Sequence, residues 1–348
     1  MKLTRSRWIA ATSGILLIAA SIQGARRPRY GGELRVEIAR MMDSRDPDAQ
    51  AADPAVEALR QGLLSQISET APGRSGPFRV AKWAPGKAMR LEAVDEYERG
   101  RPFLDAVEIR RVSNVNDRLL DLELGKTDVA AVEVTDVRRL QRQGLTVKQT
   151  RPEDTLALLF ENAQVPANVR EALALAIDRT TMQRVLLDRQ GEISGALLPE
   201  WLSGYAFLFS TERDVTRAKM LARGAAPLKF AYDGADPLVR SVAERIVVNA
   251  AEAGLVLRTG SSHCDVRLRR LPLLSSDARQ ALEEDAQILG MTIPDAATPY
   301  EAERSLLKDF RVIPLFHLPL VYAVRANVRN WTDLRHLDDV WLENVSKP

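Results

Sequence analysis

The residues with the most obvious potential for chemistry stand together at His263, Cys264 and Asp265. An imidazole and a thiolate are good ligands for transition metals. A metal site needs further ligands, and His317 and His336 stand at no motif spacing from this triplet. We therefore expect an ordinary strand start here, with no metal and no cofactor.

Patterns typical of catalysis are missing from the sequence. Cys264 has no histidine partner in a catalytic pattern, so a buried and inert thiol is expected. No serine stands in a G-x-S-x-G elbow, no phosphate-binding loop is present, and Glu283-Glu284 is typical of an exposed helix. The sequence therefore favours a protein that is not an enzyme.

The composition indicates a globular protein with a packed core. The chain has 348 residues, of which 45% are hydrophobic, and its 49 basic and 47 acidic residues leave a net charge of +2. This balance gives no electrostatic reason to expect a nucleic-acid partner. The short basic run at Arg267, Arg269 and Arg270 is interpreted as solvated surface. With Cys264 as the single cysteine, no internal disulfide can form.

The N-terminus predicts export from the cytoplasm. Lys2, Arg5 and Arg7 precede an apolar run from Trp8 to Ile22, which has the length of a secretory signal rather than of a membrane-spanning helix. Small residues follow without a clean A-x-A site. Cleavage is the expectation, and an uncleaved anchor is the alternative.

A strand-helix-strand unit is predicted over residues 227–258, with Asp236 and Pro237 at the start of the helix. Open α/β layers bind ligands at the carboxyl ends of their strands, which makes Tyr232, Asp233 and Asp236 candidate contacts. Asp236 also suits a helix cap, and Tyr232 also suits a partly buried strand position. These structural roles stay open beside the functional ones.

The stretch from Ser75 to Pro102 concentrates turn residues between alternating apolar segments. The alternation around Phe78 and Met89, with Pro85-Gly86 between them, predicts an antiparallel hairpin. A helix that ends at Gly125 and a further strand follow.

These segments resemble the extracytoplasmic solute-binding proteins, family 5, of peptide, dipeptide and nickel ABC transporters. The resemblance covers the chain from about Gly31 to the C-terminus and rests on a series of motifs in the family's order. They are "GPF" from Gly76, "WAPG" from Trp83, the segment from Asp95 to Asp105, "GKTD" from Gly125, "NVREALALAIDR" from Asn168 and "VIPLF" from Val312.

The resemblance implies an α/β fold with two lobes, of the periplasmic-binding-protein type II class, that close on a solute about a hinge. The boundaries that it implies are a signal peptide or anchor at 1–25, the first part of lobe I at 26–157, lobe II at 158–315, and a return to lobe I at 316–348.

Two departures from the family pattern affect the solute site. The extra subdomain that the family carries before Gly76 is largely missing, with one short helix from Pro54 in its place. The family's ammonium-binding aspartate also lacks a clear equivalent, since Asp277 stands nearby in a different context. We expect a shorter or more open cleft and weaker peptide binding, because a buried ammonium needs a carboxylate partner.

The predicted ligand-binding residues are Tyr232, Asp233, Trp201, Tyr205 and Asp277, and no catalytic residue or metal ligand is predicted. Trp201 and Tyr205 correspond to a Pro-rich loop of the family, where aromatic rings can clamp a solute. Packing within that loop is the alternative role for both rings.

The resemblance implies the solute-binding component of an ABC importer. Such a protein binds a peptide-like or other small polar solute between its lobes and presents it to a permease in the inner membrane. We expect a periplasmic monomer without a nucleic-acid partner. The alternative is a degenerate binding protein that serves as a sensory or interaction module without transport.

Overall fold

The structure is a computed structural model that describes residues 30–45, 51, 53–68, 76–205, 207–260, 263–293, 295, 298–332 and 342–347. The predicted signal peptide or anchor at 1–25 and His336 lie outside these residues. No helix within the described ranges is both long enough and apolar enough to cross a membrane.

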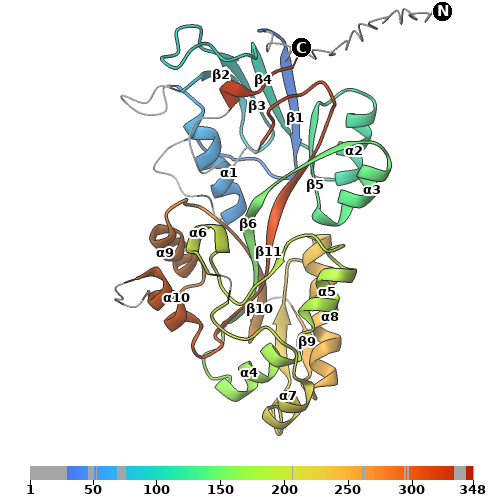
Figure 1. The fold of residues 1–348 in the computed structure, drawn as a ribbon, viewed down its shortest axis with the longest axis vertical. Helices are drawn as coiled ribbons and strands as arrows, with labels where there is room; N and C mark the ends of the chain where they lie inside the picture. The colour runs from blue at the N-terminus through green and yellow to red at the C-terminus, as the bar shows by residue number, and fades with distance from the viewer. Residues whose placement is uncertain are drawn as a thin grey trace, which may run out of the picture.

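One mixed sheet runs through both lobes (Figure 1). Within the described residues its strand order is β2-β3-β4-β1-β5-β11-β6-β10-β8-β9, and β7 pairs with β11. The strands are β1 (Glu33–Ile38), β2 (Phe78–Ala84), β3 (Ala88–Ala93), β4 (Ala106–Arg111), β5 (Val129–Val132), β6 (Thr146–Phe160), β7 (Glu192–Ile193), β8 (Leu228–Ala231), β9 (Leu257–Thr259), β10 (Val266–Pro272) and β11 (Val312–Val324).

The long strands β6 and β11 connect the lobes. They pair antiparallel from Thr146 opposite Val324 in lobe I to Leu159 opposite Val312 in lobe II. Register shifts interrupt this pairing after Pro314 and on both sides of Pro319. Proline cannot donate a hydrogen bond to a strand ladder, so these irregularities accommodate it within a central strand. In Figure 1 the two strands cross the waist between the lobes side by side.

Lobe I is built on β1 to β5. β1 lies parallel to β4 and β5, while β2, β3 and β4 form an antiparallel meander. Its helical elements are α1 (Pro54–Ser65), α2 (Val115–Glu123), η1 (Val134–Asp136), α3 (Val137–Arg142) and the C-terminal turn η2 (Leu342–Asn344). The side chain of Asp53 caps α1 by accepting a hydrogen bond of 2.9 Å from the Ala55 backbone N–H.

The predicted hairpin and "GKTD" motif are parts of this scaffold. β2 and β3 pair antiparallel across a turn at Gly86, whose φ of 65° favours glycine, and this confirms the hairpin. Asp128 is buried and accepts hydrogen bonds from the backbone N–H of Arg35 (3.0 Å) and from Nζ of Lys347 (2.9 Å). The motif therefore ties β1 and the C-terminal segment to β5.

Lobe II contains the strand-helix-strand unit that the sequence predicts. β8 leads into α8 (Pro237–Glu252) and then β9, which lies parallel to β8. β10 pairs parallel with β8 and antiparallel with β6, which joins this unit to the crossing strands. The remaining helices of the lobe are α4 (Ala167–Ala176), α5 (Arg179–Val185), α6 (Glu200–Ser203), α7 (Val215–Leu221), α9 (Ala278–Ile288) and α10 (Pro299–Leu307).

A continuous apolar core crosses the waist on one side of the sheet. A single cluster of buried residues contains Val132 and Leu140 of lobe I together with Leu228 and Ile246 of lobe II. A separate cluster fills lobe I between α1 and the meander, and another packs α9 and α10 against lobe II. The two lobes are therefore packed bodies that share one sheet.

Candidate functional site

The candidate site is a cleft between α1 of lobe I and β10 with α9 of lobe II. Three cavities of about 150, 320 and 360 Å³ form it, and we call them the inner, middle and outer cavities of the inter-lobe cleft. The inner and middle cavities share Arg40, Ala55, Asp154 and Arg270 as lining residues. The middle and outer cavities share lining residues as well, so the three form one continuous groove between the lobes.

Arg270 of β10 occupies the centre of the cleft. Its Nε donates to Oδ2 of Asp154 on β6 at 2.7 Å, and its Nη1 lies 3.2 Å from Oδ2 of Asp236 and 3.7 Å from Oε2 of Glu133. Burial disfavours its charge, but Asp154, Glu133 and Asp236 hold the pKa of Arg270 above its usual range. The guanidinium therefore stays charged. The interpretation of this residue as solvated surface is wrong, because the side chain is only 19% exposed.

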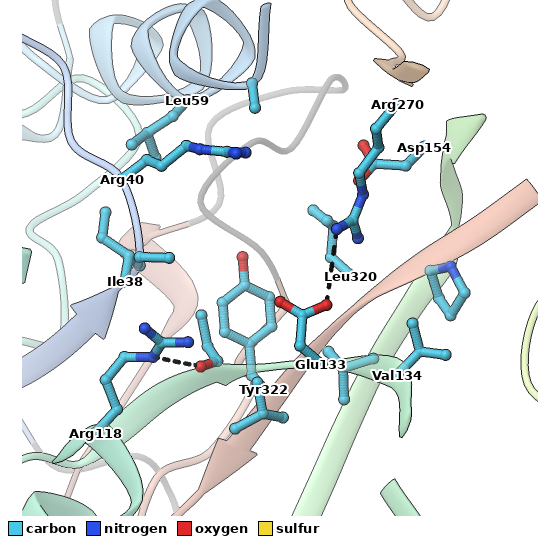
Figure 2. Close-up of a pocket in the computed structure, with 16 residues that line it drawn as sticks. Ile38, Arg40, Leu59, Arg118, Glu133, Val134, Asp154, Arg270, Leu320 and Tyr322 are labelled. Carbon is cyan, nitrogen blue, oxygen red and sulfur yellow. Dashed lines mark hydrogen bonds and ion pairs between the residues drawn. The ribbon is translucent and has the colours of Figure 1, made fainter. Parts of the chain in front are cut away.

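Glu133 reaches the cleft from lobe I, directly after β5. Figure 2 shows Glu133 and Arg270 pointing toward each other, so this ion pair crosses between the lobes. Burial raises the pKa of Glu133, and Arg270 offsets part of that effect. Arg118, also in lobe I, is buried and donates to the carbonyl oxygens of Ala131 (2.7 Å), Val112 (2.5 Å) and Ser113 (3.0 Å).

A second ion pair crosses the cleft at Arg40. This residue follows β1 and lies 3.2 Å from Asp53 within lobe I and 3.5 Å from Asp233 of lobe II. Asp233 and Tyr232 both line the middle cavity, and the Tyr232 ring packs against Phe230 at a centroid distance of 5.6 Å. These two predicted residues therefore lie where a solute can reach them.

Asp236 has the structural role that the sequence predicts for it. Its Oδ1 accepts hydrogen bonds from the backbone N–H groups of Leu238 (2.9 Å) and Val239 (3.1 Å) at the start of α8. Its Oδ2 faces Arg270, so the same carboxylate caps the helix and pairs with the central cation.

The other three predicted residues lie outside the three cavities and have partners within the protein. Trp201 donates its indole N–H to the Pro152 carbonyl at 2.8 Å, and the Arg151 guanidinium lies 3.5 Å from the centre of its ring. Tyr205 donates its hydroxyl to Oε2 of Glu303 at 2.6 Å. Asp277 caps α9 by accepting from the Gln280 N–H at 2.9 Å. Their contact with a solute stays a prediction.

Two buried residues, Glu303 and His317, hold the loop before α6, a role that the sequence does not predict for either. Glu303 accepts the backbone N–H groups of Leu197 and Leu198 as well as the Tyr205 hydroxyl, and burial raises the pKa of Glu303 to about 7. His317 on β11 lies with Nε2 3.0 Å from the Ala196 carbonyl oxygen and 3.1 Å from that of Leu197. Because both neighbours are acceptors, Nε2 carries the hydrogen. Each of these two residues contacts partners more than 90 residues away in sequence, so no local sequence pattern indicates their role.

The His263-Cys264-Asp265 triplet forms no metal centre in the described part of the chain, where no group of three or more His, Cys, Asp or Glu side chains is placed to hold an ion. The Cys264 thiol donates to Oε2 of Glu161 at 3.0 Å. Burial and this carboxylate raise the pKa of Cys264 to about 11, so the sulfur remains a protonated thiol.

Replacing Arg270 tests the energetic role of the cluster. Arg270→Met removes the cation that three carboxylates share, and breaking such a buried pair should lower the free energy of unfolding by about 3–5 kcal/mol at pH 7. Urea unfolding measures the loss. The control Arg267→Met breaks a more exposed pair with Glu161, where we expect a loss of about 1 kcal/mol. Equal losses in the two variants would contradict the assignment of Arg270 as the buried centre.

His317 should make the protein sensitive to acid. Burial lowers the pKa of His317 to about 4, so below pH 6.5 the unfolded chain binds a proton that the folded chain excludes. The stabilisation from this group is present above pH 6.5 and is lost as the pH falls toward 4, by about 3 kcal/mol. Unfolding curves at both pH values should show that His317→Gln lacks this loss and that His263→Gln, at an exposed position, retains it. The same acid loss in both variants would refute the assignment.

Comparisons with known proteins agree on one family. The model of "Bacterial extracellular solute-binding proteins, family 5 Middle" matches residues 50–256. The oligopeptide-binding protein AppA of Bacillus subtilis is 29% identical over 144 residues, which are 39% of this chain and 25% of that protein. The probable D,D-dipeptide-binding periplasmic protein DdpA of Escherichia coli is 24% identical over 260 residues, which are 72% of this chain and 47% of the relative. The matched regions thus span from a quarter to about half of these relatives.

The fold is also similar to that of a solved substrate-binding protein. The crystal structure of the ABC transporter substrate-binding protein CtaP from Listeria monocytogenes superposes with a TM-score of 0.70 at 13% identity, covering 92% of this chain and all of that chain. The family match covers more than half of the sequence, and the two-lobed fold agrees with it. The chain belongs to the bacterial extracellular solute-binding proteins, family 5.

Proposed function

We propose that this protein is the solute-binding component of an ABC importer, and that it encloses a peptide-like or other small polar solute in the inter-lobe cleft. The observation that carries the proposal is the composition of the cleft walls. Each lobe supplies charged groups that meet partners from the other, in the pairs Arg40–Asp233 and Arg270–Glu133. The names of AppA and DdpA, which refer to oligopeptides and D,D-dipeptides, support a peptide-like solute.

The protein performs no reaction in this proposal. The lobes move about β6 and β11, within which the predicted boundaries at 157/158 and 315/316 fall. The protein is exported to the periplasm, acts as a monomer, and delivers its solute to a permease in the inner membrane. Tyr232 and Asp233 are proposed as solute contacts because they line the middle cavity.

The alternative role, a sensory or interaction module without transport, requires no enclosed solute. The continuous groove, which both lobes line with charged and apolar groups, favours solute binding over that role.

A thermal-shift panel tests the proposal. The dialysed protein is mixed with amino acids, di- and tripeptides, sugars, monoamines or nickel salts. A bound solute at a hundred times its Kd adds about 2.7 kcal/mol to the free energy of unfolding, which raises Tm. Ala55→Trp should abolish the rise, because Ala55 lines both the inner and middle cavities and a large ring would fill them.

The control for this variant is Ala81→Trp, at an exposed position of β2 in lobe I, which should leave the rise in Tm unchanged. Two outcomes would contradict the proposal. One is a panel in which no solute raises Tm. The other is a rise that Ala55→Trp does not reduce.

A further inference from the structure

The inner cavity contains one carboxylate that is under-paired. The Glu133 side chain makes no hydrogen bond within the described ranges, and its nearest cation, Nη1 of Arg270, lies 3.7 Å from Oε2. Its side chain is 24% exposed, and it points into the cavity in Figure 2. A partly buried carboxylate with free acceptor sites gains from a hydrogen-bond donor, above all a charged one.

The guanidinium groups that line the same cavity already have partners. Arg40 pairs with Asp53 and Asp233, Arg270 pairs with Asp154 and Asp236 in addition to Glu133, and Arg118 donates to three backbone carbonyls. Arg40 and Arg270 together have five carboxylate partners, of which Asp154 and Glu133 line the inner cavity itself, whereas the partners of Arg118 are backbone carbonyls. A solute carboxylate that entered this cavity would displace an existing pair, whereas a solute cation would complete one.

The rest of the inner cavity is apolar and small. Ile38, Leu59, Val134 and Leu320 contribute aliphatic side chains to its lining, and the Tyr322 ring lies among them with its hydroxyl directed into the cavity (Figure 2). A volume of about 150 Å³ equals that of apolar cavities that hold a molecule the size of benzene. The space therefore suits a short apolar body with one polar end.

We propose that Glu133 receives the cationic head of a compact organic amine, and that the aliphatic wall of the inner cavity holds the body of that amine. This inference rests on the proposed function, because it specifies which solute the cleft prefers. The preferred solute carries an ammonium group without a carboxylate beside it. Lobe I therefore supplies the anionic partner, through a residue at the end of β5.

A ligand-observed NMR titration tests this assignment with four matched probes. They are n-butylammonium, n-butanol, butyrate and 4-aminobutyrate, added to the dialysed full chain at constant ionic strength. Butylammonium should bind at least tenfold more tightly than each of the other three, because it alone offers Glu133 a charged donor without bringing a carboxylate.

The variant Glu133→Gln should weaken butylammonium binding at least tenfold. Glu92→Gln removes the same charge from the exposed β2–β3 hairpin and should leave the affinity unchanged. Near-UV circular dichroism verifies that each variant is folded. If Glu133→Gln does not fold, two other measurements test the inference. One is the selectivity of the native protein among the four probes. The other is the variant Glu133→Asp, which should keep the preference for the amine.

The inference is overturned if butanol, butyrate or 4-aminobutyrate binds as tightly as butylammonium, or if Glu133→Gln and Glu92→Gln bind it equally. It is also overturned if none of the four binds while a peptide or sugar of the thermal-shift panel does, and the proposed function then stands. If nothing in the panel binds either, the proposed function fails with it.

Discussion

The antiparallel pairing of β6 with β11 is the constraint on which the rest of the structure depends. These two strands belong to both lobes. Each of the other strands is positioned by pairing with β6 or β11 directly, or with a strand that is itself joined to one of them through the sheet. β5 joins β11 at its lobe I end, and β10 joins β6 at its lobe II end. As a result, Glu133 after β5, Asp154 on β6 and Arg270 on β10 meet at the waist.

Ion pairs at the waist link the two lobes across the cleft. Arg270 pairs with carboxylates from its own lobe, from the crossing strand β6 and from lobe I. Arg40, in lobe I, pairs with Asp53 of its own lobe and with Asp233 of lobe II. Ions in such a position cost free energy unless their partners are well placed. A solute that supplies a missing partner therefore favours the arrangement in which both walls surround it. The register shifts around Pro319 lie next to this point, in the strand about which the lobes would move.

Local patterns predict the scaffold well and the cleft poorly. The hairpin around Gly86, the unit from β8 to β9 and the Asp236 cap follow from turn and cap chemistry contained in a few neighbouring residues. The role of Arg270 does not, because its partners Asp154 and Glu133 are distant in sequence and only the sheet brings them together. For that reason, the short basic run that contains Arg270 has the sequence pattern of a solvated surface segment.

The predicted ligand contacts divide in the same way. Tyr232 and Asp233 follow a strand end, where the general rule for α/β layers places ligands, and both line the cleft. The prediction for Trp201 and Tyr205 rests on correspondence with the family alone, and the prediction for Asp277 rests only on its place near the family's missing aspartate. Each of the three has a hydrogen-bond partner within the protein. Whether a residue faces a cavity or a packed loop depends on tertiary contacts that a motif does not encode.

The most direct test of a hinged, solute-enclosing protein is the distance between its lobes. Spin labels at the exposed positions Lys82 on β2 and Glu283 on α9, in a Cys264→Ser background, report that distance by pulsed electron paramagnetic resonance. The panel solute that stabilises the protein most should narrow the distance distribution and shift its maximum. An identical distribution with and without that solute would contradict closure of the lobes about β6 and β11.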